Sequence, residues 1–370
     1  MARRRMLVLC PFPRDTAAGQ RLKYEPYFDD WRAQGWDIDV SPFCDRQLWR
    51  VLYQPGGIGA KVLGTVRGYA RRLADLGRLR RYDLVYVYLW VTPLGPALFE
   101  RLVLRLARAV VYDLEDNIVA GQEPRADNHP NPLVRWLKGA GKARVMVARA
   151  DAVIVASPYL VGPARARNLA RQVRCIPPSL DTDRICPVSC ARAPGARVVI
   201  GWTGTFSSRI YLDDIAGALR ALARRVPFTL RVIGNFDYAI DGVVCEVVRW
   251  SAAHEARDLQ SLDIGIYPLR DDAWTRGKAG LKIIQYQAAG LPCVASHVPL
   301  SAVQLRDGES GFLVRDHAEW VDRLERLVRD ADLRRRMGAA GRADAVALYS
   351  RSAIAPAYRA VLDLVATADA

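Results

Sequence analysis

The chain has 370 residues, more than one ordinary hydrophobic core needs and enough for two domains. Its 51% hydrophobic and 25% charged residues exclude disordered, fibrous and collagen-like proteins. The formal net charge is +15, of which +13 falls in the first 180 residues and +2 in the rest. This asymmetry favours a polyanionic or membrane-surface partner for the first half.

The cysteines and histidines show no metal-binding pattern. The seven cysteines form no Cys-x-x-Cys pair and no zinc-finger spacing with histidine, which predicts a reduced, cytoplasmic protein without a structural metal. The apolar run from Met6 to Cys10 is too short for a signal peptide and indicates a first buried strand. Because no stretch of ~18 apolar residues is present, we expect any membrane contact to be peripheral, on the inner face of the membrane.

Short runs of branched residues alternate with longer stretches of helical period, which is typical of parallel sheets covered by helices. In the first half we expect strands over 5–10, 38–42, 84–88, 110–113, 152–156 and 173–176, and helices over 24–34, 61–79, 96–108, 132–149 and 158–169. The proline-rich segment 178–196 is expected to be a linker. The second half predicts strands over 198–202, 229–234, 243–249, 264–268 and 292–295, and helices over 213–225, 253–261, 281–289 and 318–329.

This pattern predicts an α/β protein of two doubly wound domains, over 1–177 and 197–345, that face each other across a cleft. Further helical patterns cover 343–349 and 353–364, and we expect a C-terminal helix within 346–370 to return to the N-terminal domain. Ligands of doubly wound folds bind at the carboxyl ends of the strands, so the cleft is the expected site.

A glycine-flanked turn opens the helix expected from Leu281. Gly277 and Gly290 bracket this segment, and Lys278 and Lys282 stand beside the helix start. The backbone N–H groups of a helix N-terminus, with cations next to them, suit an anion such as a diphosphate. The alternative is a helix with solvated lysines and with glycines that serve packing.

This segment, with Ile200-Gly-Trp-Thr-Gly-Thr-Phe-Ser-Ser-Arg-Ile-Tyr-Leu212 and Gly308-Glu-Ser-Gly-Phe-Leu-Val314, resembles the donor domain of the family 4 retaining glycosyltransferases. Their GT-B fold has two Rossmann-like domains. The likeness is continuous over 170–315 and thin in the first half, as expected if that half binds a variable acceptor. It implies a nucleoside diphosphate sugar as donor in 197–345, with no cofactor and no metal.

The resemblance assigns donor binding by position. Gly204 and Thr205 would approach the diphosphate, and Arg209 would offer a cation, although many relatives have lysine one position later, where Ile210 stands. Arg209 as a solvated turn residue and Trp250 as a core residue are the alternatives. The implied donor residues are Gly19, Gly204, Thr205, Arg209, Trp250, Lys278, Ala279, Gly280, Leu281, Lys282 and Gln285.

The chain departs from the family at one pair of positions. Relatives commonly have two glutamates eight residues apart flanking this helix start, where Gly277 and Gln285 stand here. Gln285 could still bond a ribose hydroxyl, whereas Gly277 offers no side chain. This implies that backbone amides around Lys278 to Leu281 hold the sugar; loss of activity is the competing explanation.

Three carboxylates follow one another at the end of the strand expected over 110–113. Such a cluster at a carboxyl strand end is poorly explained by packing, although capping of the next segment is an alternative. The family often has an aspartate pair here, and Asp113 and Asp116 fit its spacing as catalytic residues, with Glu115 expected on the other side of the pleat. The resemblance gives acceptor contacts to Arg21, Glu115 and Asn117.

Residues 61–81 predict an amphipathic basic helix able to lie on anionic lipid. More often such an apolar face packs on the domain's own sheet, and both hold if the apolar side faces the core while the basic rim faces the membrane. The apolar residues are Val62, Leu63, Val66, Tyr69, Ala70, Leu73 and Leu76, and the cations are Lys61, Arg67, Arg71, Arg72, Arg78, Arg80 and Arg81.

Together these features predict a metal-independent, retaining glycosyltransferase. It would move a sugar from a nucleoside diphosphate sugar to a hydroxyl of a cell-surface glycan or glycolipid, as in polysaccharide or lipopolysaccharide biosynthesis. The leaving diphosphate would act as the base, so the protein chiefly orients groups and stabilises phosphate charge. A sugar-nucleotide epimerase of related fold and a catalytically silent nucleotide-sugar-binding protein are the alternatives. Nucleic acid is not expected as a partner, because no module interleaves basic and aromatic residues.

Overall fold

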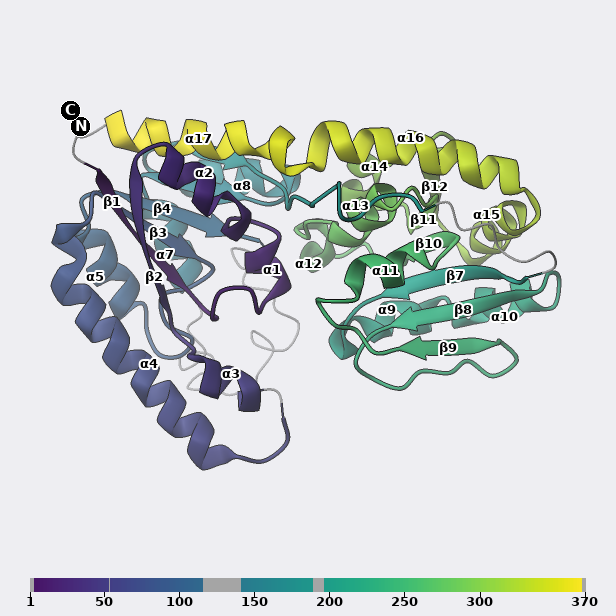
Figure 1. Ribbon diagram of the computed structural model, residues 1–370, viewed down its shortest axis with the longest axis horizontal. Helices are drawn as coiled ribbons and strands as arrows, with labels where there is room; N and C mark the ends of the chain where they lie inside the picture. Colours follow the sequence, from purple (N-terminus) through teal and green to yellow (C-terminus); the bar gives the residue numbers. More distant parts are fainter. Residues whose placement is uncertain (1–2, 53, 116–140, 189–195, 368–370) are drawn as a thin grey trace. The chain divides into compact units, whose positions relative to one another are not determined.

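The computed structural model describes residues 3–52, 54–115, 141–188 and 196–367, and the chain divides into two compact units (Figure 1). Unit 1 comprises Met1–Pro178, Gly277–Ala279 and Ile354–Ala370, and unit 2 comprises Ser179–Arg276 and Gly280–Ala353. Each unit is built on one sheet of six strands.

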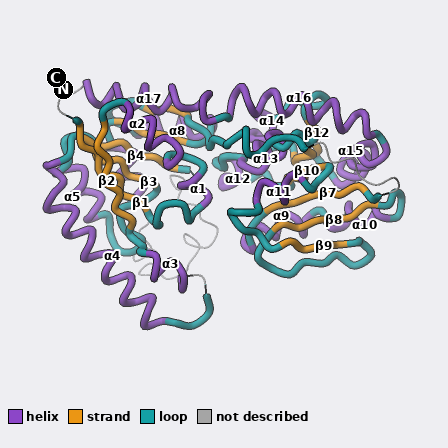
Figure 2. The backbone as a smooth tube through the Cα atoms, viewed as in Figure 1, coloured by secondary structure: helices purple, strands orange, loops and turns teal. Residues whose placement is uncertain are grey.

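The sheet of unit 1 has the strand order β2-β1-β3-β4-β5-β6, with all neighbours parallel. Helices cover both faces, so the central strands are buried on both sides and appear in the sequence as continuous apolar runs. Its strands, orange in Figure 2, are β1 (Arg4–Cys10), β2 (Trp36–Pro42), β3 (Leu84–Tyr88), β4 (Val110–Leu114), β5 (Ala152–Val155) and β6 (Val173–Cys175).

The helices of unit 1 are α1 (Ala18–Arg21), α2 (Phe28–Ala33), α3 (Arg46–Leu52), α4 (Ile58–Arg78), α5 (Leu98–Leu106), α7 (Lys142–Arg149), α8 (Pro158–Arg167) and, from Ile354 on, α17 (Arg351–Thr367). On one face of the sheet, Trp31 of α2 and Tyr358 of α17 join Tyr86 of β3 in one apolar cluster. On the other face, Met146 of α7 and Leu160 of α8 belong to a second cluster. The last helix of the chain therefore completes the core of unit 1.

The sheet of unit 2 has the strand order β12-β11-β10-β7-β8-β9, again with all neighbours parallel. Its strands are β7 (Val198–Thr203), β8 (Phe228–Ile233), β9 (Cys245–Val248), β10 (Ile264–Tyr267), β11 (Cys293–Ser296) and β12 (Gly311–Val314). The strand order reverses between β7 and β10 in unit 2 and between β1 and β3 in unit 1. In doubly wound sheets, ligands bind beyond the carboxyl ends of the strands at such reversals.

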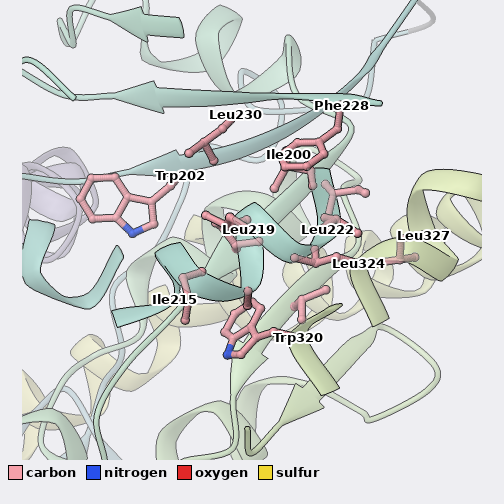
Figure 3. Close-up of a cluster of buried hydrophobic side chains, with 14 of the residues drawn as sticks. Ile200, Trp202, Ile215, Leu219, Leu222, Phe228, Leu230, Trp320, Leu324 and Leu327 are labelled. Carbon is pink, nitrogen blue, oxygen red and sulfur yellow. The ribbon is translucent and has the colours of Figure 1, made fainter. Parts of the chain in front are cut away.

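The helices of unit 2 are α9 (Arg209–Asp214), α10 (Ala216–Ala223), α11 (Glu255–Gln260), α12 (Ala273–Arg276), α13 (Leu281–Ala288), α14 (Pro299–Gln304), α15 (His317–Arg329) and α16 (Ala331–Tyr349). Figure 3 shows Ile200 and Leu230 of the sheet directed toward Leu219 of α10 and Trp320 and Leu324 of α15. Burying each such side chain contributes about 1.5–3 kcal/mol, and this cluster fixes one face of β7 and β8.

The predicted α/β class with two doubly wound sheets is confirmed, and each expected strand has a counterpart within three residues at either end. The structure divides the helix expected over 213–225 into α9 and α10, which meet at Ile215. It adds β12 and the short helices α1, α3, α12 and α14 to the expected elements. Part of the helix expected over 132–149 lies outside the described residues.

The helix α4 has the reverse of its expected orientation. Its buried residues are Gly64, Gly68, Arg72 and Asp75. Most of its large apolar side chains are exposed, and only Tyr69 and Leu76 are partly buried against apolar clusters. A Cβ atom on Gly64 would lie 2.9 Å from Leu48, and one on Gly68 would lie 2.6 Å from the Phe43 ring. The two glycines therefore let α4 approach α3 and Phe43 closely, and this approach turns its apolar side outward.

Arg72 belongs to the core and not to the basic rim expected of α4. Its guanidinium is fully buried and donates to the backbone oxygens of Val91 at 2.8 Å, Ser41 at 3.0 Å and Cys10 at 2.9 Å. Asp75 balances its charge at 3.1 Å. Because Ser41 lies in β2 and the other two acceptors end or follow β1 and β3, one side chain joins three strand ends.

Candidate functional site

In unit 2, the loop after β7 begins at a glycine that no other residue can replace without rearrangement. The N–H of Gly204 donates to the carbonyl of Ile233 at 3.0 Å, and a Cβ at this position would lie 2.3 Å from the Trp202 ring. Thr205 follows, exposed, and caps the turn that leads to Ser208. Gly204 and Thr205 thus stand at the reversal of strand order, where the sequence placed a diphosphate.

Arg209 is half-buried at the start of α9. Its Nε donates to Asp213 Oδ2 at 3.2 Å, and its guanidinium carbon lies 5.5 Å from the centroid of the Phe206 ring. Exposed pairs of this spacing contribute only about 0.3–0.5 kcal/mol, so a phosphate could displace Asp213.

Lys282 stands over the reversal of strand order itself. Its ammonium lies 4.7 Å from the ring centroid of Trp202 in β7 and 5.3 Å from that of Tyr267 in β10. Cation–π contacts of this kind contribute about 0.5–1 kcal/mol and restrain the cation. A fixed positive charge therefore lies at the carboxyl ends of the two central strands, beside the first turn of α13.

Gly280 sets the start of α13. It has φ +66° and caps the helix without a side-chain hydrogen bond, and a Cβ there would lie 1.9 Å from Gln304 Oε1. Leu281 is the first helical residue, and Lys278 and Ala279 directly precede the cap. The helix start therefore presents backbone N–H groups, which together with its dipole favour an anion.

Gln285 has a carboxylate partner that the sequence did not reveal. Its Nε2 donates to Glu255 Oε1 at 3.2 Å, and Trp250 Nε1 donates to the same oxygen at 3.4 Å. Glu255 and Gln285 are both buried. Trp250, Glu255 and Gln285 come from the loop after β9, from α11 and from α13, so only the fold brings them together. The one sequence signal was a carboxylate five residues after Trp250.

In unit 1, Gly19 lies against Glu115. A Cβ on Gly19 would be 2.2 Å from the Glu115 carboxylate and 2.6 Å from the Tyr88 hydroxyl, which donates to that carboxylate. Burial and the Glu115 charge raise the pKa of Tyr88 well above 10, so the hydroxyl stays protonated as a donor. Arg21, the last residue of α1, is half-buried.

The Asp113 carboxylate is fully buried and interacts with a buried cation and a buried hydroxyl. It forms an ion pair with buried Lys23 and accepts from Tyr86 OH at 2.5 Å. Burial raises the pKa of Asp113, and the neighbouring Lys23 charge opposes that rise. Glu115 bonds Tyr88, which shares an apolar cluster with Tyr86. The expectation that Glu115 lies on the other side of the pleat is therefore wrong: Asp113 and Glu115 share one face.

Asp116 and Asn117 lie outside the described residues. Among the residues that the structure does describe, no group of three or more His, Cys, Asp or Glu side chains is placed to hold a metal ion. No helix in that part of the chain has the length and apolar character needed to cross a membrane.

Comparison with solved structures defines the class of fold. Sucrose-phosphate synthase from Thermosynechococcus elongatus matches with a TM-score of 0.72 at 17% identity, over 99% of this chain and 100% of that one. Anabaena HepE in complex with UDP matches with a TM-score of 0.66 at 16% identity, over 97% and 99%. The chain has the GT-B fold of these glycosyltransferases.

Residues 197–330 match the family model described as Glycosyl transferases group 1. The second half of the chain thus carries a Glycosyl transferases group 1 domain, and the resemblance predicted from the sequence is confirmed.

Two relatives by sequence carry related names. D-inositol 3-phosphate glycosyltransferase of Stackebrandtia nassauensis is 28% identical over 260 residues, which are 61% of this chain and 56% of the relative. GDP-mannose-dependent alpha-(1-6)-phosphatidylinositol monomannoside mannosyltransferase of Mycolicibacterium smegmatis is 31% identical over 223 residues, 52% and 57% of the two chains. The match thus spans somewhat over half the length of either relative.

Proposed function

We propose that this chain is a metal-independent, retaining glycosyltransferase that moves a sugar from a nucleoside diphosphate sugar to a hydroxyl of a cell-surface glycan or glycolipid. It would work in the cytoplasm, in peripheral contact with an anionic membrane. In this proposal unit 2 binds the donor and unit 1 the acceptor.

The fixed charge of Lys282 carries the donor half of the proposal. Its ammonium, Gly204 and the start of α13 surround the point where β7 and β10 diverge, the position at which doubly wound sheets bind phosphates. We assign to Lys282 the role of stabilising the negative charge that develops on the leaving diphosphate. A positioned cation stabilises that charge without a metal, and the diphosphate then accepts the proton of the incoming hydroxyl.

The nucleoside is assigned to the cluster of Trp250, Glu255 and Gln285. The family that the sequence resembles commonly has a glutamate at the position of Gln285. Here Glu255, from α11, places a carboxylate against the Gln285 side chain. We propose that this pair holds a ribose hydroxyl and that Trp250 lines the base. The missing glutamate is then replaced from α11, which favours an active enzyme over a silent one.

The acceptor is assigned to the face of unit 1 that carries Arg21 and Glu115, whereas Gly19 beside them keeps the donor role that the resemblance implies. Glu115 has a fixed carboxylate that can accept from a sugar or polyol hydroxyl. Asp116 and Asn117 keep their proposed roles as catalytic and acceptor-binding residues, whereas the buried ion pair gives Asp113 a positioning role. The names of the two relatives, which refer to inositol phosphate and a phosphatidylinositol mannoside, support a polyol-containing or lipid-linked acceptor.

A donor panel tests the proposal. The purified chain is titrated with UDP, GDP, ADP and dTDP and their sugars by calorimetry, and Lys282→Ala is compared with Arg315→Ala, an exposed arginine of the same unit. Loss of a charged hydrogen bond costs about 1.5–3 kcal/mol, so Lys282→Ala should weaken the preferred nucleotide about 10- to 100-fold, and the control should not.

Two results would contradict the proposal: no nucleotide binds, or Lys282→Ala binds as tightly as the unaltered chain. For the reaction itself, proton NMR of the first product formed reads the anomeric configuration. An inverted product would exclude the retaining mechanism while leaving the donor site in place.

A further inference from the structure

Helix α4 carries a stripe of large apolar side chains that no part of the described structure covers. Val62, Leu63, Val66 and Leu73 are 51–61% exposed, and Ile58 at the helix start is 76% exposed. The buried residues of the same helix are small or ion-paired. The apolar side that the hydrophobic effect usually turns toward the core is therefore left exposed to solvent.

The spacing places this stripe opposite the buried side. At 100° per residue, Val62, Val66 and Leu73 fall within about 40° of one another, on the side away from Gly68 and Asp75. Exposed small residues Ala70, Ala74 and Gly77 fill the gaps between them. From Ile58 to Gly77 the stripe extends about 28 Å at 1.5 Å per residue, so it is long and narrow.

A second exposed apolar pair continues the stripe. Leu94 and Leu98 are 48% and 55% exposed, and the Tyr69 hydroxyl of α4 donates to the Leu94 carbonyl at 2.7 Å. The ring of Phe99 lies 5.7 Å from that of Tyr69. The start of α5 is therefore held beside α4, and the two elements form one surface, here called the α4 face: Ile58, Val62, Leu63, Val66, Leu73, Leu94 and Leu98.

The exposed charges of α4 and of the two arginines that follow it are of one sign. Arg67 is exposed beside the stripe, and Arg80 and Arg81 are exposed directly after the helix. Asp75 is the single acidic residue of α4, whose 21 residues are all described, and it is buried against Arg72 and Arg78. No anionic side chain of the helix thus opposes an approaching negative surface.

We propose that the α4 face inserts into the boundary between headgroups and acyl chains of an anionic bilayer, with Arg67, Arg80 and Arg81 at the headgroups. This deepens the membrane contact of the proposed function and rests on it. A convex apolar stripe with a cationic edge fits such a surface. A second copy of the chain would bring two cationic edges together in a half of net charge +13, so charge complementarity favours lipid.

Insertion predicts a binding energy with two parts. The cationic part weakens as salt shortens the Debye length from about 10 Å at 0.1 M to about 3 Å at 1 M. The apolar part does not weaken with salt. Binding by the α4 face should therefore persist in part at 1 M salt, whereas a purely electrostatic contact would be lost.

Vesicle flotation tests the proposal with the full chain, using phosphatidylcholine vesicles with and without phosphatidylglycerol. The variant Val62→Asp/Val66→Asp is compared with Val303→Asp, whose side chain is 61% exposed on α14 of unit 2. We expect the vesicle partition coefficient of the α4 variant to be at least about tenfold lower than that of the unaltered chain, a loss of about 1.4 kcal/mol of binding free energy. The control should bind like the unaltered chain. Arg67→Gln/Arg80→Gln/Arg81→Gln should lose only the salt-sensitive part.

Three outcomes would overturn the insertion. The first is that the unaltered chain fails to float although it binds its nucleotide. The second is that the α4 variant floats as well as the control, and the third is that all vesicle binding disappears at high salt. A chain that is dimeric without vesicles and becomes monomeric in the α4 variant assigns this face to a protein contact instead. Nucleotide affinity, measured on the same samples, separates these results from failure of the donor site.

Discussion

Two buried carboxylates show how far a residue's role depends on its partners. Asp113 and Glu255 both lie close to positions that the family resemblance singles out, yet the first is enclosed by Lys23 and Tyr86 while the second is shared by Gln285 and Trp250. Asp113 was predicted as catalytic from its place at a strand end and from the aspartate pair of the resembled family, and Glu255 was missed. Neither set of partners can be predicted from the neighbouring sequence, because Lys23 and Asp113 are 90 residues apart and Glu255 and Gln285 are 30 residues apart.

Glu255→Gln should remove discrimination at the ribose. The substitution preserves size but replaces a carboxylate by an amide, which accepts less strongly from a ribose hydroxyl. We expect the unaltered chain to bind the preferred nucleoside diphosphate more tightly than its 2′-deoxy or 3′-deoxy analogue, and the variant to lose most of that ratio. Calorimetry with the three ligands measures it. A variant that is merely less stable, with an unchanged affinity ratio, would exclude Glu255 from the site.

Asp113→Asn should destabilise the protein severely. It leaves the Lys23 ammonium buried without its counter-charge, and breaking a buried pair costs about 3–5 kcal/mol. Replacing both residues, as Lys23→Met/Asp113→Leu, removes the orphaned charge and should recover most of that loss, as denaturant unfolding would show. If the double variant folds but transfers no sugar, the Lys23–Asp113 pair is needed for the reaction; normal turnover would show that the pair serves stability alone.

At the scale of elements, the sequence predicted where strands and helices lie better than which side of a helix is buried. The strands were found because parallel strands covered on both faces are apolar throughout, and Val85 and Val153 are examples, both 0% exposed. The orientation of α4 escaped prediction because an apolar stripe normally faces the core. What reverses it is Gly64, Gly68 and the acceptors of Arg72, which come from three strand ends distant in sequence.

The glycines of α4 should separate into two classes on substitution. Gly68→Ala places a methyl group 2.6 Å from the Phe43 ring and should cost about 1–3 kcal/mol of overpacking. Gly77→Ala meets no atom within 4 Å and should stabilise the helix by about 0.5–1 kcal/mol. Thermal unfolding of the two single variants checks the difference in sign. Equal effects would mean that α4 does not pack through Gly68.

At the scale of the whole molecule, each unit has its own sheet, and the core of unit 1 includes side chains of α17. Tyr358 of α17 is fully buried in unit 1, with its ring 4.8 Å from Tyr27 and 5.7 Å from Trp31. The sequence predicted a helix over 353–364 from its helical pattern, and we expected a C-terminal helix within 346–370 to return to the first domain. The sequence could not identify Tyr358 as a contact, because ring packing depends on the folded surface that receives it.

Tyr358→Ala should loosen unit 1 selectively. Removing a large buried aromatic side chain costs about 3–5 kcal/mol, and Tyr358 packs within the apolar cluster of unit 1 to which β1, β3 and β4 contribute. Hydrogen exchange should show lower protection in those strands and unchanged protection in β7, β8 and β10. Leu348→Ala, at an exposed site on α16, is the control. Equal loss of protection in both units would show that they unfold as one.

The place of α17 also governs the order in which the chain can mature during synthesis. The ribosome releases β1 to β6 first, but Tyr358, Val361 and Leu362, which close one face of their sheet, leave it only after all of unit 2. Until then the nascent first half exposes an open apolar sheet face beside the apolar stripe of α4. Synthesis and docking of α17 are thus the steps that bury this face, and a nascent chain stalled before α17 should be a substrate for chaperones, whereas a chain that contains α17 is not.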